Sequence, residues 1–203
     1  MRTTLFSLLG YLSGSVLYAR VFARVFRKEE MIEKSKDKNP GTANAFLYGG
    51  FWCGCLTLLF DLLKGFVPVY LYLRCVGRTM PDGYGLSLVL AAPVVGHAFP
   101  VFYRGRGGKG IAVTFGCLLG LLPMWQPVGA LIVFFLFFSG ILRITPHLKR
   151  TLVVYVCTLC SLLYRGQTSV LIGFAMITAV VSLRMYLSTE EKERMKVRLL
   201  WMH

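Results

Sequence analysis

The residue types best suited to chemistry gather in one glycine-rich stretch, GHAFPVFYRGRGGKG, at residues 96–110. The glycines that can present backbone N–H groups are Gly107, Gly108 and Gly110. Three cationic side chains fall close together: Arg104, Arg106 and Lys109. Because Lys109 stands just before an apolar run, the pattern favours a phosphate bound at a helix N-terminus over a flexible turn. The Walker pattern is absent, which argues against a nucleoside triphosphatase.

A second polar loop, NPGTAN at residues 39–44, places two amide side chains around a glycine. Asn39 and Asn44 can hydrogen-bond oxygen-rich groups, and Gly41 permits close backbone approach. Taken alone, this segment is interpreted more simply as a turn followed by a helix cap. Both interpretations stay open at this point.

Charged side chains also occur within apolar runs. Asp61 and Lys64 are three residues apart and therefore share one helix face. Ions inside a membrane span are costly and are usually functional or paired with each other, and a structural ion pair is the favoured interpretation here. His97 is equally compatible with a structural hydrogen bond and with a ligand-binding role.

Several kinds of site are not indicated. No Asp or Glu occurs between Asp82 and Glu190, so the glycine-rich loop has no carboxylate close to it in sequence. The sequence contains no nucleophile elbow and no HExxH motif. The six cysteines fit ordinary apolar helix positions. We therefore expect no metal and no cofactor, and chemistry based on binding and electrostatic stabilisation more than on a protein general base.

Hydropathy predicts the elements that must hold these loops. The chain is 56% hydrophobic and 16% charged, whereas a soluble domain carries roughly 25% charged residues. The apolar runs are Leu5–Phe22, Phe46–Val76, Tyr84–Phe102, Gly110–Trp125, Val128–Ile144, Thr151–Tyr164 and Thr168–Leu187. They predict an all-α polytopic integral membrane protein, with about seven transmembrane helices in a single domain covering residues 1–203. The fourth and sixth runs are short, so the count is open by one or two.

The basic residues predict the orientation. The net charge of +14 does not indicate nucleic-acid binding, because the basic residues lie between apolar runs and not along one face. With seven spans and the N-terminus outside, most of the 23 Lys and Arg residues fall on the cytoplasmic side. The opposite side has only Arg2, Arg74, Arg78 and Arg165. The positive-inside rule therefore predicts a cytoplasmic C-terminus and two cytoplasmic polar loops.

Four segments in order, GYLSGSVLYARVFAR, NPGTANAF, DLLKGFVPV and GHAFPVFYRGRGGKGIAVTFG, resemble bacterial acyl-phosphate-dependent glycerol-3-phosphate acyltransferases, the PlsY family. The resemblance covers about residues 10–116 well and the later spans only in hydropathy. Its most specific part is GHxFPVF followed by GGKG. It implies seven spans, an outside N-terminus and cytoplasmic catalytic motifs, in agreement with the charge pattern.

The resemblance implies acyl transfer from acyl-phosphate to the 1-hydroxyl of sn-glycerol 3-phosphate, which gives lysophosphatidic acid in phospholipid synthesis. The catalytic residues implied are Lys109, Ser35 and Asn44. The substrate-binding residues implied are Asn39, Gly41, His97, Arg104, Arg106, Gly107, Gly108, Gly110 and Arg184. We expect a monomer in the bilayer of the bacterial inner (plasma) membrane, with its active site on the cytoplasmic side.

Two motifs depart from the family pattern. Where the family has GSGN, this chain reads KSKDKN, and the family serine corresponds to Ser35 if two residues are inserted or to Asp37 without a gap. The third motif, usually like YRHRxN, reads SLRMYLSTEEK, which places Met185 and Ser188 near the expected His and Asn and retains Arg184. The alternative hypotheses are a divergent member that binds a lipid phosphate or uses another acyl acceptor, and a transporter.

Overall fold

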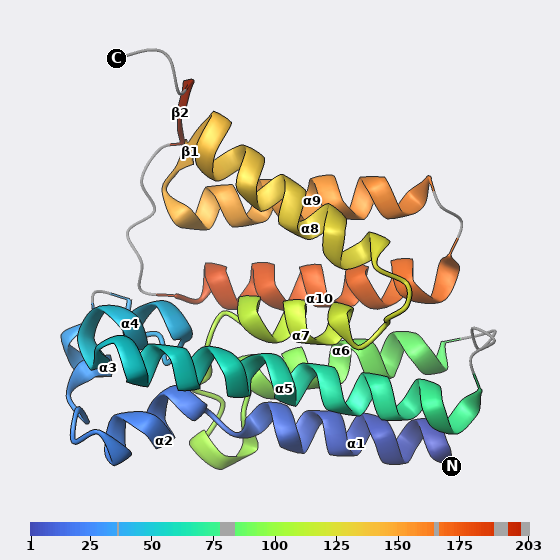
Figure 1. Ribbon diagram of the computed structural model, residues 1–203, viewed down its shortest axis with the longest axis horizontal. Helices are drawn as coiled ribbons and strands as arrows, with labels where there is room; N and C mark the ends of the chain where they lie inside the picture. The colour runs from blue at the N-terminus through green and yellow to red at the C-terminus, as the bar shows by residue number, and fades with distance from the viewer. Residues whose placement is uncertain (36, 78–83, 165–166, 189–194, 200–203) are drawn as a thin grey trace.

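Long apolar segments interrupted by glycine, proline and charged residues fold into a row of packed helices (Figure 1). The structure is a computed structural model that describes residues 1–35, 37–77, 84–164, 167–188 and 195–199. Lys36, Arg78 and Arg165 therefore lie outside the described residues.

The elements are, in chain order, α1 Arg2–Ser15, α2 Tyr18–Val25, α3 Met31–Lys34, α4 Thr42–Gly49, α5 Phe51–Val76, α6 Gly85–Ala98, the 3₁₀ turn η1 Val101–Tyr103, α7 Ile111–Leu119, α8 Gln126–Leu136, the π-turn η2 Phe137–Ile141, β1 Leu142–Thr145, α9 His147–Leu163, α10 Thr168–Tyr186 and β2 Lys196–Leu199.

Four helical stretches in the described part of the chain are long and apolar enough to cross a bilayer: Arg2–Val25, Phe51–Val76, Gly85–Tyr103 and Thr168–Tyr186. They coincide with the first, second, third and seventh predicted spans. The fourth predicted span contains α7, which has 9 residues and so extends about 14 Å, against a bilayer core of about 30 Å. The mostly helical membrane architecture is confirmed, whereas the count of seven spans stays a prediction.

Small residues let the central helices approach closely. α1 packs on α6, α6 packs on α10, and α5 and α7 lie beside them (Figure 1). A Cβ atom on Gly14 of α1 would overlap the carbonyl of Pro93, and one on Gly96 of α6 would overlap the carbonyl of Tyr11. Close backbone contact at small residues is a usual way for helices to associate in lipid. This crossing fixes the end of α6 against the end of α1.

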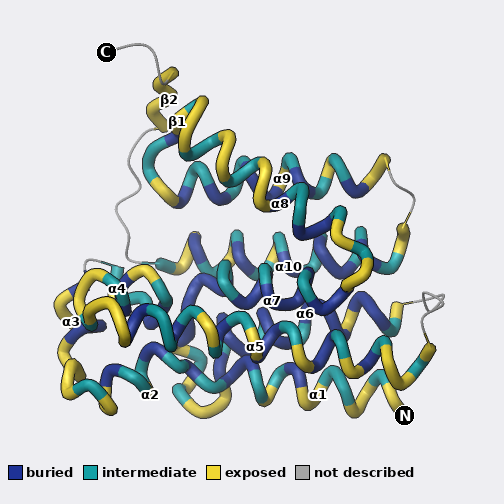
Figure 2. Tube along the Cα trace, viewed as in Figure 1, coloured by how far each residue is buried: buried dark blue, intermediate teal, exposed yellow. Residues whose placement is uncertain are grey.

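Figure 2 shows buried positions inside the bundle and exposed positions on its outer face, and apolar residues occur at both kinds of position. Leu90, Phe174 and Ile177 are fully buried between helices. On the outside, Leu8 of α1 is 54% exposed and Leu59 of α5 is 49% exposed. Apolar residues on the outer face as well as in the interior are expected for a protein that is surrounded by lipid.

The predicted fifth span differs from the structure at its end, so the all-α prediction needs a correction. The helix gives way after Ile141 to strand β1, which pairs antiparallel with β2. The register places Ile144 opposite Val197 and Arg143 opposite Arg198. Pro146 follows directly, and a residue before proline is pushed out of the α region toward extended geometry.

Candidate active site

The helices break first at Val16 and Leu17, between α1 and α2. A helix end leaves carbonyl groups without partners inside the helix, and the Val16 carbonyl accepts a hydrogen bond from Lys64 Nζ at 2.7 Å. The same ammonium pairs with Asp61 at 2.7 Å and donates to His97 Nδ1 at 2.8 Å. The predicted ion pair of α5 is therefore confirmed, and it also joins the ends of α1 and α6.

The glycine-rich loop turns back over His97. The Gly108 N–H donates to the His97 carbonyl at 3.0 Å, and a Cβ atom on Gly108 would overlap the His97 ring. A Cβ atom on Gly107 would overlap the His97 carbonyl. Gly110 has φ of 79°, a left-handed conformation that favours glycine, at the start of α7. These glycines fit the loop onto α6, and the Gly108 N–H is engaged within the protein.

The loop before α4 meets the glycine-rich loop at Lys109. Asn39 Oδ1 accepts the backbone N–H of Lys109 at 3.1 Å. The Asp37 carboxylate accepts Lys109 Nζ at 2.8 Å, Asn44 Nδ2 at 2.8 Å and the Asn39 N–H at 3.3 Å. Asn44 also donates to the Asn39 carbonyl at 2.8 Å. Two loops that are about 70 residues apart in sequence thus form one polar network.

The carboxylate in this network is ionised at neutral pH. Burial raises the pKa of Asp37, but the hydrogen bonds from Lys109, Asn44 and the Asn39 N–H, together with the Lys109 charge, bring the pKa below its ordinary value of 3.8. No carboxylate lies close to the glycine-rich loop in sequence. The fold supplies one from a distant loop, because the Asp37 carboxylate reaches Lys109.

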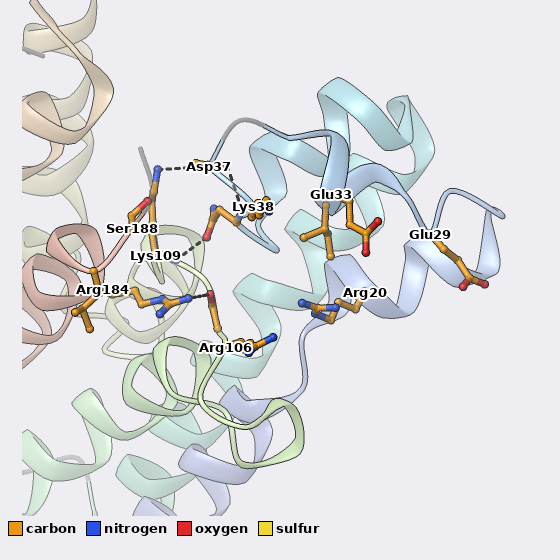
Figure 3. Close-up of a pocket in the computed structure, with 13 residues that line it drawn as sticks. Arg20, Glu29, Glu33, Asp37, Lys38, Arg106, Lys109, Arg184 and Ser188 are labelled. Carbon is orange, nitrogen blue, oxygen red and sulfur yellow. Dashed lines mark hydrogen bonds and ion pairs between the residues drawn. The ribbon is translucent and has the colours of Figure 1, made fainter. Parts of the chain in front are cut away.

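A cavity of about 650 Å³, called here the polar cavity, opens beside the network. Its charged lining residues are Arg20, Glu29, Glu33, Asp37, Lys38, Arg106, Lys109 and Arg184. Figure 3 shows Arg184 and Lys109 on one side of this cavity and Arg20, Glu29 and Glu33 on the other. Cationic groups outnumber carboxylates, so the polar cavity suits a small anionic ligand.

A second cavity of about 430 Å³, called here the apolar cavity, lies next to the first. Its apolar lining residues include Leu58, Ile111, Ala112 and Phe115, and its polar ones include Asn44, Asp61, His97 and His147. Asp37, Asn39 and Lys109 line both cavities. These three side chains therefore stand at the junction of a charged and an apolar compartment.

The end of α10 borders the polar cavity. Arg184 Nη2 donates to the Gly107 carbonyl at 2.6 Å (Figure 3), and Leu187 and Ser188 continue the lining. Met185, near the position expected for a histidine, is fully buried and lines neither cavity. Among the described residues of the altered third motif, Arg184, Leu187 and Ser188 thus reach the site.

Most of the residues predicted for the site come together around the two cavities. The predicted residues on the lining are Asn39, Gly41, Asn44, His97, Arg106, Gly107, Lys109, Gly110 and Arg184. Ser35, Arg104 and Gly108 line neither cavity. The Ser35 hydroxyl is buried and donates to the Ile32 carbonyl at 2.7 Å. Of the two residues that could correspond to the family serine, Asp37 lines both cavities and Ser35 lines neither.

Other lining residues were not assigned to the site from the sequence. One sequence feature could have indicated Arg20 as a site residue: it lies within an apolar run, where a charged side chain is unusual. Glu29 and Glu33 have the appearance of solvent-facing residues in a charged segment, and His147 follows a proline with no neighbouring motif. Only the packing of α2, α3 and α9 brings these residues to the cavities.

The sequence matches the family described as Glycerol-3-phosphate acyltransferase over residues 4–195. The chain belongs to the glycerol-3-phosphate acyltransferase family. Members from Pseudoalteromonas translucida and Albidiferax ferrireducens are 38% and 40% identical to it, over 59% and 58% of this chain. The matched segments make up 56% and 52% of those proteins, so the chain spans about half the length of the curated relatives it matches.

Solved structures agree with the family assignment at the level of the fold. PlsY (YgiH), an integral membrane glycerol 3-phosphate acyltransferase, superposes in its glycerol 3-phosphate form with a TM-score of 0.78 at 23% identity, covering 92% of this chain and 90% of that one. Its lysophosphatidic acid form gives a TM-score of 0.75 at 24% identity, covering 91% and 88%. The chain is therefore an integral membrane protein with the PlsY fold.

Proposed function

We propose that this protein transfers a fatty acyl group from acyl-phosphate to the 1-hydroxyl of sn-glycerol 3-phosphate, giving lysophosphatidic acid and phosphate. The observation that carries the proposal is that Asp37, Asn39 and Lys109 line both cavities. A reaction between an anionic acceptor and a long apolar donor needs one compartment of each kind, with the reacting groups held where the two meet.

Glycerol 3-phosphate fits the chemistry of the polar cavity. Lys38 and Arg106 line it and have no ion-pair partner within the described residues. Arg20 Nε is buried and has no hydrogen-bond partner among the described groups. A charge-assisted hydrogen bond to phosphate contributes about 1.5–3 kcal/mol. Glu29 and Glu33 offer acceptors for the glycerol hydroxyl groups, since carboxylates accept O–H hydrogen bonds.

The acyl-phosphate donor fits the apolar cavity. Its chain would lie against Leu58, Ile111 and Phe115, and its phosphate would lie at the junction, next to Lys109 and the N-terminus of α7. A helix N-terminus favours negative charge through its aligned peptide dipoles. Lys109 adds a full positive charge where the leaving phosphate develops its own negative charge.

The reaction needs little activation, because a mixed anhydride of a carboxylic and a phosphoric acid is already reactive toward a hydroxyl group. The hydroxyl oxygen would attack the acyl carbonyl carbon, and the C–O bond to phosphate would break. Holding the two substrates in contact and neutralising the leaving phosphate are then the main tasks of the protein. Both cavities lie within one chain, which is why we propose that a monomer is sufficient.

The same proposal includes seven membrane spans, an outside N-terminus and a cytoplasmic active site in a bacterial plasma membrane. The distribution of Lys and Arg supports it. In Figure 1, α1 and α8 begin at one end of the helix row, whereas the loops that carry Asp37 and Lys109 lie at the other end. That arrangement fits a bundle whose chain crosses back and forth.

The direct test uses purified protein with palmitoyl-phosphate and glycerol 3-phosphate, followed by detection of lysophosphatidic acid and released phosphate. We expect equal amounts of the two products, and none when either substrate is omitted. If the folded protein consumes neither substrate, the alternative is favoured in which the protein binds a lipid phosphate without catalysing this reaction. Uptake of glycerol 3-phosphate into protein-containing liposomes without acyl transfer would favour a transporter.

A further inference from the structure

Three hydrogen-bond donors around the junction of the two cavities converge on one acid of the protein itself. Lys109 Nζ and Asn44 Nδ2 lie 2.8 Å from the Asp37 carboxylate, and the Asn39 N–H lies 3.3 Å from it. An ammonium, an amide N–H₂ and a backbone N–H directed at one oxyanion are the donors expected around a phosphate. The Asp37 carboxylate therefore occupies the position of an anionic ligand.

The Asp37–Lys109 pair is only partly shielded from solvent. Exposed fractions are 9% for the Lys109 side chain and 17% for that of Asp37, against 1% and 2% for Lys64 and Asp61. Asp61 borders only the apolar cavity and Lys64 borders neither, whereas Asp37 and Lys109 both border the two cavities from which a ligand can enter. A substrate phosphate that reaches Lys109 must therefore compete with Asp37 for the same ammonium.

We propose that Asp37 is the counter-ion of Lys109 in the resting protein and becomes the general base once substrate phosphate has taken its place. This inference rests on the proposed acyl transfer, and it assigns to this chain a proton acceptor that the sequence alone does not predict. Asp37 sits at the junction of the polar and apolar cavities, where the acceptor hydroxyl must meet the acyl carbonyl.

The step balances in atoms and electrons. An Asp37 carboxylate oxygen takes the proton of the 1-hydroxyl while the hydroxyl oxygen forms an ester bond to the acyl carbon. The bond from the acyl carbon to the phosphate oxygen breaks, and the phosphate leaves with that electron pair beside Lys109. The proton on Asp37 then passes to the released phosphate, and the carboxylate returns to Lys109.

Loss of Lys109 as a partner also improves Asp37 as a base. The charge and hydrogen bond of Lys109 help to keep the pKa of Asp37 below its ordinary value, and a base is most effective when its pKa is closer to the working pH. Phosphate bound to Lys109 removes one partner and adds negative charge nearby, and both changes raise the pKa of Asp37. Binding of substrate would thus switch on the base that consumes it.

The other charged or titratable groups that line the two cavities around Asp37 must be considered in any pH study. They are Arg20, Glu29, Glu33, Lys38, Arg106, Lys109 and Arg184 in the polar cavity, and Asp61, His97 and His147 in the apolar cavity. Comparison with an Asp37 variant separates their contributions from that of Asp37, because they are present in both proteins.

The kinetic test is Asp37→Asn, whose amide oxygen can still accept from Asn39 and Asn44 but is a very weak base. We expect kcat to fall about 100-fold or more, with no rise in KM for acyl-phosphate. The kcat of the wild type should decline at acidic pH as a single group becomes protonated, and this decline should be absent in Asp37→Asn. Asp37→Glu should restore part of kcat and the acidic decline. The control is Glu30→Gln, which removes a carboxylate from the exposed Lys34 pair and should leave kcat unchanged.

A second measurement does not depend on turnover. Binding of inorganic phosphate to detergent-solubilised protein at neutral pH should be about tenfold tighter in Asp37→Asn, because the competing carboxylate is gone. Lys109→Ala in the same background should remove that gain. Unchanged phosphate affinity in folded Asp37→Asn would overturn the displacement, and wild-type kcat in that variant would overturn the base. If the wild-type protein never transfers acyl groups, both the proposed function and the role of Asp37 as general base are wrong. The phosphate-binding measurement still decides, in that case, whether Asp37 is a displaceable counter-ion.

Discussion

Lys64 of α5 donates a hydrogen bond from Nζ to His97 Nδ1 at the end of α6, over 2.8 Å and within the protein interior. Because an ammonium group can only donate, Nδ1 is the acceptor and the ring proton lies on Nε2. Nε2 faces Gly108, so the buried lysine orients the ring on which the glycine-rich loop rests. The ion pair inside the bundle is in this way connected to the loop that carries Lys109.

Lys64→Met should destabilise the protein by about 3–5 kcal/mol, because Asp61 would remain as a buried charge without its partner. The double variant Asp61→Asn with Lys64→Met should recover much of this loss, since no buried charge is left. Unfolding in detergent micelles measures both. The matched control is Lys34→Met, which breaks an exposed pair and should cost less than about 1 kcal/mol. Equal losses in the single and double variants would show that charge compensation is not the cause.

Lys109→Ala should remove most acyltransferase activity while the helical fold is retained, because Lys109 is the cation at the junction of the two cavities. Lys109→Arg should recover only part of it, since a planar guanidinium does not replace a compact ammonium in a tight glycine loop. Initial rates with acyl-phosphate, together with circular dichroism, provide the measurement. Near-wild-type turnover of Lys109→Ala would refute the role assigned to this residue.

Lys38→Ala and Arg184→Ala address the cations that border the polar cavity. At least one of them should raise KM for glycerol 3-phosphate about tenfold, as expected for the loss of one charge-assisted hydrogen bond to phosphate. Arg74→Ala is the control, because Arg74 lies at the far end of α5 and contacts Tyr70. A wild-type KM in both test variants would mean that other cationic residues bind the phosphate of glycerol 3-phosphate.

Gly107→Ala should lower both stability and kcat/KM, because the new Cβ atom would overlap the carbonyls of His97 and Ala98 and push the loop away from α6. The expected loss of stability is about 1–3 kcal/mol, as for other overpacked sites. Gly140→Ala is the matched control, since nothing lies within 4 Å of the added methyl group. A fully active and stable Gly107→Ala would mean that the loop can repack around His97.

A reporter fused after residue 203 should be cytoplasmic, and a reporter inserted at Gln126 should be external, if seven spans are present with the N-terminus outside. A pair of reporters whose activity depends on the compartment, such as alkaline phosphatase and green fluorescent protein, gives the readout. The reverse result at both positions would invert the proposed orientation.

Local patterns were sufficient to predict the elements and several of the contacts within them. Apolar runs identify membrane helices because lipid requires every backbone polar group to be bonded within the helix. The Asp61–Lys64 pair follows from a spacing of three residues on one helix face. GHxFPVF followed by GGKG indicated the family. Each of these inferences depends on residues that are close together in the chain.

Only the tertiary structure decided what Lys109 meets. Sequence alignment left Ser35 and Asp37 as alternatives, and the fold buries the Ser35 hydroxyl against Ile32 while the Asp37 carboxylate reaches Lys109, 72 positions away. It likewise brought Arg184 to the carbonyl of Gly107 across 77 positions. Hydrophobic periodicity specifies which face of a helix is apolar, but not which distant loop will lie over its end. That choice is made by the close crossing of α1 with α6 and by the packing of α10 on α6, where small side chains determine how the helix ends meet.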